Sequence, residues 1–167
     1  GLFPDEVEER RAEGAERVLA SLLAKIRAGG GRLLPGAREV LSELRTRGIP
    51  RGIVTNARWT YLEAVLGAND LADLVDPALC EGDRPGAGKG GLAVEILHTW
   101  GVSPVEAGFV GDRESDRQAA REAGTRFFGV VGHGPSDELA GADLVIRDLR
   151  ELLRIEMLPL TSPPLGR

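Results

Sequence analysis

Two carboxylates lie four residues apart, directly after an expected strand. Residues 107–110 have the apolar character of a buried strand, and Asp112 and Asp116 follow it. Paired carboxylates at a strand end are hard oxygen ligands of the kind that hold Mg²⁺ beside a phosphate. Alternatively, Asp116 or Ser115 caps the helix expected over 115–123 and Asp112 is a solvated loop acid. That alternative explains one acid well and two less well, so the pair favours a Mg²⁺ site.

A hydroxyl and an amide occupy the end of an earlier expected strand, over 49–54. Thr55 and Asn56 follow this strand and precede the helix expected over 58–66. Such groups before a helix N-terminus suit an anion such as phosphate. Taken alone, a simple helix-capping role explains them better.

The third candidate region is the loop over 82–91, which holds Arg84, Lys89 and five glycines. It fits neither a dinucleotide fingerprint nor a nucleoside-triphosphate loop, because no clear strand leads into it and Lys89 is followed by glycine. Two interpretations have equal weight. Either the loop brings a cation to an anionic ligand, or it is a solvated surface loop.

The elements that position these residues alternate between strand and helix. Continuous apolar strands in such an alternation predict a parallel sheet covered on both faces, with ligands at the carboxyl ends of the strands. The fold class expected is therefore α/β, a doubly wound parallel sheet. An amphipathic helix over 5–27 lies outside the alternation and is expected to belong to a cap. The expected strands are 49–54, 107–110, 126–131 and 143–146, and the helices between and after them are 35–47, 58–66, 92–100, 115–123 and 148–155.

Composition narrows the class of protein. A hydrophobic fraction of 42% and a charged fraction of 28% are ordinary for a soluble globular domain. The net charge of −5 argues against nucleic acid as partner, and no apolar run is long enough for a membrane span. The single cysteine, Cys80, fits a reducing compartment, so a cytoplasmic location is expected.

In order along the chain, these segments resemble the haloacid dehalogenase (HAD) superfamily, and within it the phosphoglycolate phosphatase-like branch. The segment 34–41, Leu-Pro-Gly-Ala-Arg-Glu-Val-Leu, is similar to the branch's entry helix after the cap. The segments 52–56, Gly-Ile-Val-Thr-Asn, and 111–116, Gly-Asp-Arg-Glu-Ser-Asp, resemble its second and fourth motifs. The resemblance implies a partial helical cap over 1–32 and a HAD-like core over 33–156. Residues 157–167 are expected to form a disordered tail.

The resemblance also implies an activity, a Mg²⁺-dependent phosphatase acting on a small phosphorylated metabolite. Thr55 and Asn56 would bind phosphate, and Asp112 and Asp116 would hold Mg²⁺, with Asp112 counted among the catalytic groups. The family's third motif offers Lys-Pro. Here Arg84 and Pro85 keep that position, whereas Lys89 keeps the residue type, so the catalytic cation stays open between Arg84 and Lys89.

One departure from the family is large. The family carries Asp-x-Asp-x-Thr after its first strand, with a nucleophilic and an acid–base aspartate, and no Asp-x-Asp occurs before residue 33. We therefore expect a protein without its first strand and first half-cap, inactive by itself. Removal of that central strand either exposes two strand edges or forces the flanking strands to meet. The expected partner is a chain supplying the missing strand, or a second copy of this chain.

Three other readings remain open at this stage. The first is a catalytically silent HAD-fold module that binds phosphate, metal or a partner. The second is one half of a split enzyme. The third is a receiver domain of the response-regulator type, which shares the doubly wound sheet but needs paired acids after its first strand.

Overall fold

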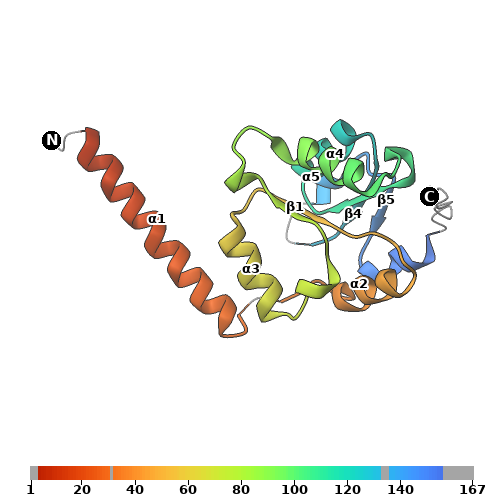
Figure 1. The fold of residues 1–167 in the computed structure, drawn as a ribbon, viewed down its shortest axis with the longest axis horizontal. Helices are drawn as coiled ribbons and strands as arrows, with labels where there is room; N and C mark the ends of the chain where they lie inside the picture. Colours follow the sequence, from red (N-terminus) through yellow and green to blue (C-terminus); the bar gives the residue numbers. More distant parts are fainter. Residues whose placement is uncertain (1–3, 31, 133–135, 156–167) are drawn as a thin grey trace, which may run out of the picture.

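The structure is a computed structural model that describes residues 4–30, 32–132 and 136–155 (Figure 1). The expected tail over 157–167 lies outside the described residues. The α-helices are α1 (Pro4–Arg27), α2 (Ala37–Thr46), α3 (Trp59–Ala68), α4 (Gly88–Trp100) and α5 (Glu114–Ala123). The strands are β1 (Ile53–Thr55), β2 (Ala78–Cys80), β3 (Gly108–Gly111), β4 (Arg126–Val130) and β5 (Leu144–Ile146). Short 3₁₀ helices are η1 (Ala72–Leu74), η2 (Glu81–Asp83), η3 (Pro104–Glu106), η4 (Ser136–Leu139) and η5 (Leu149–Arg154).

The strands form two parallel sheets rather than one. β1 pairs with β2, placing Ile53 opposite Ala78, and β3, β4 and β5 pair in that order. Among the described strands, β1 and β3 share no ladder. The α/β class with parallel strands is confirmed, and of the two outcomes expected for the sheet, exposed edges are the one observed.

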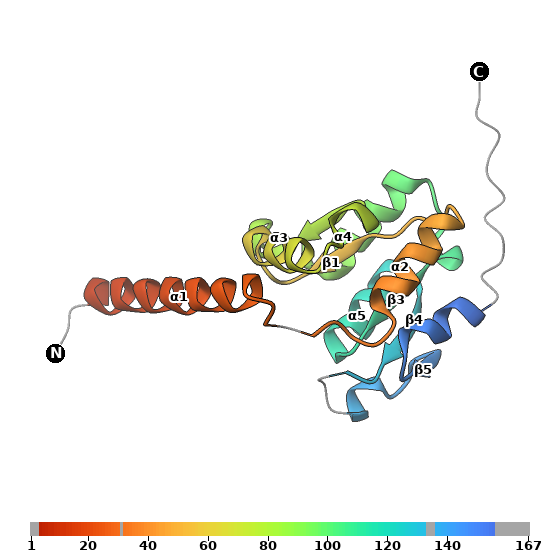
Figure 2. The same ribbon diagram turned by 90° about the horizontal axis from the view of Figure 1, so that it is seen from below.

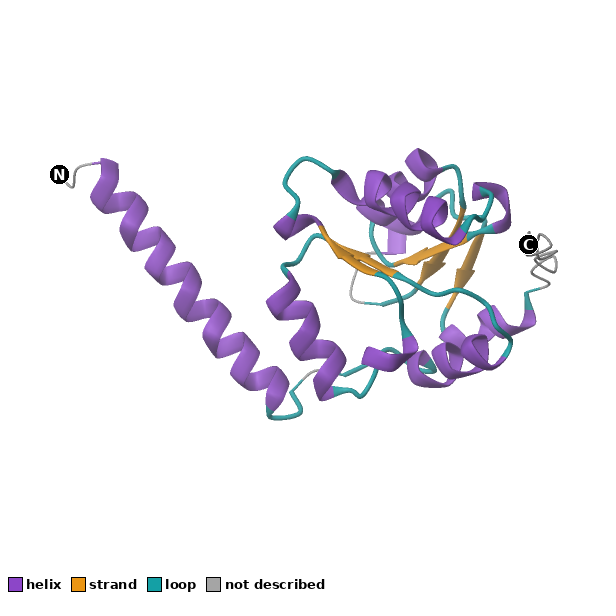
Figure 3. Cartoon of the chain, in the orientation of Figure 1, coloured by secondary structure: helices purple, strands orange, loops and turns teal. Residues whose placement is uncertain are grey.

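Helices cover both faces of the strands (Figure 3). In Figure 1, α4 and α5 lie above the strand layer, while α2, α3 and η5 lie below it. The core is divided in the same way as the sheet. One cluster around Leu62 and Leu66 packs on β1 and β2, and separate clusters containing Ala123 and Phe127 pack around β3 and β4.

Several boundaries differ from those that the sequence indicates. The expected strand 49–54 forms only at its end, because Pro50 has no N–H to donate and Arg51 makes an isolated antiparallel bridge to Asp76. The glycine-rich loop is shorter than expected, since α4 begins at Gly88. Gly90 in its first turn is buried against Glu122, where a side chain would collide, so close packing of α4 on α5 overrides the low helix propensity of glycine. The last helix is 3₁₀ rather than α.

Helix α1 extends away from the body (Figure 2). Its C-terminal end packs on α3, and Ile26 is buried there, whereas Val18 further along the helix is 69% exposed. An expected amphipathic helix is therefore present, but most of its apolar face has no neighbour within the described chain. No helix among the described residues combines the length and apolar character that a membrane span requires.

Candidate active site

The most buried ion pair of the described residues joins the first turns of two helices. Lys89 Nζ in α4 donates to Asp116 Oδ1 in α5 at 2.6 Å, and the two side chains are 15% and 10% exposed. Asp116 is the one charged residue among the described residues that is classed as buried. The pair therefore neutralises a carboxylate that would be costly to bury alone.

The second oxygen of Asp116 organises the loop after β3. Asp116 Oδ2 accepts hydrogen bonds from the backbone N–H groups of Asp112, at 3.2 Å, and Arg113, at 3.1 Å. Gly111 makes room for this arrangement, since a Cβ there would clash with the Asp116 side chain. With three donors and a helix N-terminus around it, Asp116 holds the loop in place.

Asp112 follows β3 directly and is half-buried. Its carboxylate lies beside Gly132, two residues after the end of β4, because a Cβ built on Gly132 would come 3.0 Å from Asp112 Oδ2. Gly132 was not among the site residues predicted from the sequence. Its position directly after the expected strand 126–131 could have identified it as a residue near the site. Of the predicted pair, Asp112 therefore faces Gly132, whereas Asp116 pairs with Lys89.

Thr55 and Asn56 shape the turn after β1. The Thr55 hydroxyl accepts a hydrogen bond from the Ala57 N–H at 3.2 Å, and Asn56 is exposed. The cap of α3 comes instead from Asp83, whose Oδ2 accepts from the Trp59 N–H at 2.6 Å. Sequence reasoning missed Asp83, because its partner is 24 residues away and no local pattern joins them.

The Lys89–Asp116 contact fixes which ends of the strands lie together. Helix α4 follows β2, and α5 follows β3, so contact between their first turns places the carboxyl ends of β2 and β3 at the same edge. Because β1 runs parallel to β2, its carboxyl end with Thr55 lies at that edge too. Thr55, Lys89 and Asp112 therefore belong to one edge of the strand layer, as the sequence predicts.

Arg84 points elsewhere. Its Nη1 lies 2.7 Å from both carboxylate oxygens of Glu95, on the exposed side of α4. Both side chains are about half exposed. Of the two cations that sequence reasoning left open, Lys89 is the one that the structure brings to the acids.

The rim of the loop carries further ion pairs. Arg113 Nη1 lies 3.6 Å from Glu138 Oε1, and Arg117 donates to Glu114 at 2.7 Å. The hydrogen bond from Arg117 lowers the pKa of Glu114 from its usual range. Away from this edge, burial raises the pKa of the Cys80 thiol, which keeps it protonated near neutral pH.

The donor set is small for a metal. No group of three or more His, Cys, Asp or Glu side chains that could hold a metal gathers among the described residues. Magnesium is nevertheless often held by one or two carboxylates, with water and substrate phosphate completing its shell. Asp112, with Asp116 behind it, fits that smaller requirement.

Comparison with known proteins identifies the family. A family model described as a haloacid dehalogenase-like hydrolase matches residues 2–124, well over half of the chain. The chain belongs to the haloacid dehalogenase-like hydrolase family. Its HAD-like fold also appears in solved structures. A predicted phosphoglycolate phosphatase from Haemophilus somnus has a TM-score of 0.67 and 25% identity, covering 74% of this chain and 56% of that one.

Curated relatives place the chain in the phosphoglycolate phosphatase-like branch of the HAD superfamily. The phosphoglycolate phosphatase of Escherichia coli is 28% identical over 159 residues, which are 89% of this chain and 62% of the relative. That of Pseudomonas putida is 30% identical over 123 residues, 71% of this chain and 45% of the relative. The chain therefore spans at most about six tenths of the length of these HAD relatives.

Proposed function

We propose that this chain is the larger part of a Mg²⁺-dependent HAD phosphatase that hydrolyses a phosphate monoester of a small metabolite. The observation that carries the proposal is the gathering of Thr55, Lys89 and Asp112 at one edge of the strand layer, around the buried pair of Lys89 and Asp116. Phosphoglycolate is the first substrate to test, because the curated relatives are named for it.

Each residue has a definite part in this proposal. The Thr55 hydroxyl and the start of α3 receive phosphate oxygens, and Lys89 neutralises their charge. Asp112 holds the cation, and Asp116 keeps Lys89 and the loop in position. Bound Mg²⁺ would supply further neutralisation of the phosphoryl oxygens.

The covalent step requires groups that this sequence does not supply. In the family mechanism a carboxylate attacks phosphorus, the alcohol leaves with a proton from a second carboxylate, and water then hydrolyses the aspartyl phosphate. No Asp-x-Asp occurs in the 167 residues. The chain alone should therefore bind phosphate without hydrolysing its esters at a useful rate.

Phosphate binding tests the site without requiring turnover. Calorimetry of inorganic phosphate with Mg²⁺ should give saturable binding, weakened at least tenfold by Thr55→Val. Thr46→Val is the matched control, because its hydroxyl bonds only within the surface of α2. Equal affinities in the two variants would remove Thr55 from the site.

Turnover tests the full proposal. A fusion that adds an Asp-x-Asp-x-Thr strand should hydrolyse phosphoglycolate, and Asp112→Asn should abolish that activity. Robust hydrolysis by residues 1–167 alone would contradict our account of the nucleophile. A silent fusion that still binds phosphate would favour the second candidate, a catalytically silent phosphate-binding module.

A further inference from the structure

Three successive backbone N–H groups after β3 are held by the carboxylates of two residues. The N–H groups of Asp112 and Arg113 donate to Asp116. The N–H of Glu114 donates instead to Oε2 of Glu138, at 3.0 Å. Glu114 is the first residue of α5, where a backbone N–H has no partner within its own helix. The loop is therefore anchored locally by Asp116 and also by η4, 24 residues further along the chain.

Glu138 contacts two consecutive residues of this loop with its two oxygens. While Oε2 accepts from the Glu114 N–H, Oε1 lies 3.6 Å from Arg113 Nη1. An ion pair of that length with a half-exposed arginine contributes little by itself. The hydrogen bond from a backbone N–H to a charged carboxylate is the stronger contact. The Arg113 pair thus mainly orients the Glu138 carboxylate towards Glu114.

The position of Glu138 is fixed by the core beneath it. Its neighbour Leu139 is buried in a cluster with Ala120 of α5 and Phe127 of β4. Leu139 also packs closely on β4, because a Cβ built on Gly129 would come 3.1 Å from Leu139 Cδ2. Helix η4 therefore presents the Glu138 carboxylate from a packed surface, at a set distance from the start of α5.

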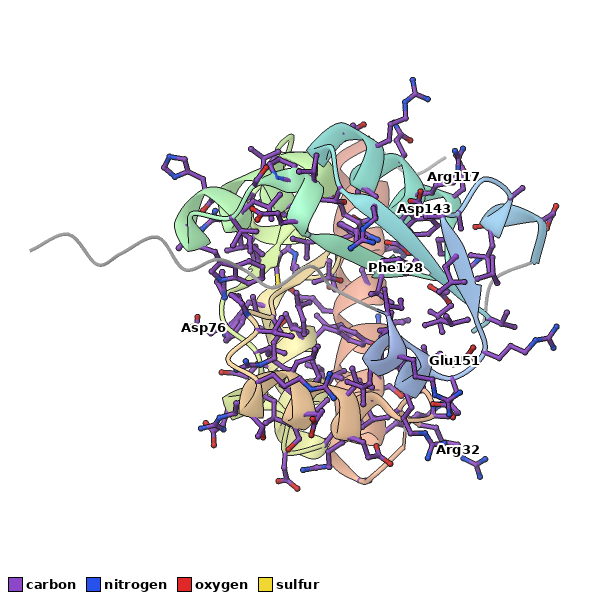
Figure 4. The ribbon with its side chains drawn as sticks, turned by 90° about the vertical axis from the view of Figure 1, so that its right-hand side faces the viewer. Arg32, Asp76, Arg117, Phe128, Asp143 and Glu151 are labelled. Atoms are coloured by element: carbon purple, nitrogen blue, oxygen red, sulfur yellow. The ribbon has the colours of Figure 1, made fainter. Side chains whose placement is uncertain are left out.

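The chain after β4 borders the Asp112 loop at further points. A Cβ built on Gly132 would come 3.0 Å from Asp112 Oδ2, and one built on Gly141 would come 3.7 Å from Arg117 Nη1. Figure 4 shows Arg117 on the same side of the body as Asp143, which precedes β5. This chain segment thus lies against the Asp112 carboxylate at Gly132 and reaches the backbone two residues later through Glu138.

We propose that Glu138 is a positioning residue for Asp112. By accepting the Glu114 N–H, it holds the loop over 112–114 so that the Asp112 carboxylate faces the bound cation. The inference rests on the proposed function, in which Asp112 holds Mg²⁺. Magnesium demands near-ideal geometry from its few protein ligands, so a ligand on a loosened loop binds it less well. Loss of a group that orients a metal ligand typically weakens metal binding by about 10–100-fold.

Two substitutions at Glu138 separate positioning from charge. Glu138→Ala removes both the acceptor and the charge, whereas Glu138→Gln removes the charge and keeps an oxygen that can accept from the Glu114 N–H. In calorimetry, Mg²⁺ affinity should fall by about tenfold or more in Glu138→Ala and stay close to that of the parent in Glu138→Gln. Asp137→Ala is the matched control, because it removes an exposed acid from the same 3₁₀ helix. It should leave the affinity unaltered.

A second measurement requires no metal. In Glu138→Ala the NMR order parameters of the amides of residues 112–114 should fall, and the Glu114 N–H should exchange faster with solvent. In Glu138→Gln both should match the parent. The amide of Ala120, on the buried face of α5, should keep its protection in every variant, which shows that the change is confined to the loop.

Each possible result decides the proposal. Unchanged order over 112–114 in Glu138→Ala overturns it, and so do equal losses of Mg²⁺ affinity in the alanine and glutamine variants, which would indicate a charge effect. Loss of protection at Ala120 as well would make Glu138 a cap of α5 and also overturn it. If the parent binds no Mg²⁺ while Glu138→Ala alone loosens the loop, the metal role of Asp112 in the proposed function fails and Glu138 still positions this loop.

Discussion

Lys89 and Asp116 form a 2.6 Å ion pair that is largely shielded from solvent and holds the starts of α4 and α5 together. Removal of one partner leaves a buried charge without its counter-charge. We expect Lys89→Met to lower the free energy of unfolding by about 3 kcal/mol, measured by urea denaturation. Lys25→Met, which alters the other lysine of the chain on exposed α1, should change stability by less than about 0.5 kcal/mol. Similar small changes in both variants would show that the pair contributes little.

Asp112 should control metal binding. Calorimetry should detect Mg²⁺ binding to the chain that is weaker than in complete HAD phosphatases, because few carboxylates gather at this edge. The heat should disappear in Asp112→Ala and persist in Asp73→Ala, which removes an exposed acid from η1. Unchanged heat in Asp112→Ala would assign Asp112 to the loop surface and leave Asp116 as a structural residue.

Asp148 should make stability depend on pH. It accepts hydrogen bonds from the backbone and side chain of Arg150, and the side-chain bond is the larger cause of a pKa lowered to about 2 from 3.8. A lowered folded-state pKa stabilises the fold above pH 3.8, and this contribution is lost as the pH falls towards 2. Asp148→Asn should therefore reduce the thermal midpoint at pH 6, and the difference from the parent should shrink between pH 4 and 2. A difference that does not vary with pH would attribute the effect to the cap of η5 alone.

Residues on the two sides of β4 should differ sharply in their contribution to stability. Ile146 of β5 is fully buried, and Ile146→Ala should cost about 2–5 kcal/mol in chemical denaturation. Val110 of β3 lines a cavity between the β1 and β3 segments and is 38% exposed, so Val110→Ala should cost less than about 1 kcal/mol. A large loss at Val110 would show that its side chain is closely packed in solution, contrary to its exposure in this structure.

Local sequence patterns predict many of the strands and helices of this fold. Apolar runs at 107–110 and 126–131 predicted strands close to their observed bounds, because each is flanked by turn-forming residues. The superfamily and the α/β class followed from the same patterns and are confirmed by the family match. The sequence patterns gave the wrong boundary where a tertiary contact determines the secondary structure. Gly90, for example, was expected in a loop but lies in α4, where Glu122 packs against it.

The sequence predicted which residues gather at the site better than it predicted the contacts that each of them makes. The residue types after each strand pointed to Thr55 and Asp112, since carboxyl ends of parallel strands share an edge. The sequence could not predict that Asp116, and not Asp112, forms the buried ion pair. That pair depends on Lys89, which lies 27 residues before Asp116 in the chain. The same holds for Arg84, whose partner Glu95 is fixed only once α4 has formed.

The division of the sheet has a consequence for how the molecule opens. The sheet with β1 and β2 and its core cluster are built from residues 33–80, whereas β3 to β5 and their clusters use residues 93–146. Each half is thus nearly contiguous in sequence, and contacts such as those of α4 with β1 and α2 with η5 connect them. The two halves share no strand ladder among the described strands, although single hydrogen bonds such as Leu149 N–H to Pro35 O join them. The halves can therefore lose their protection from hydrogen exchange one after the other instead of in a single cooperative step.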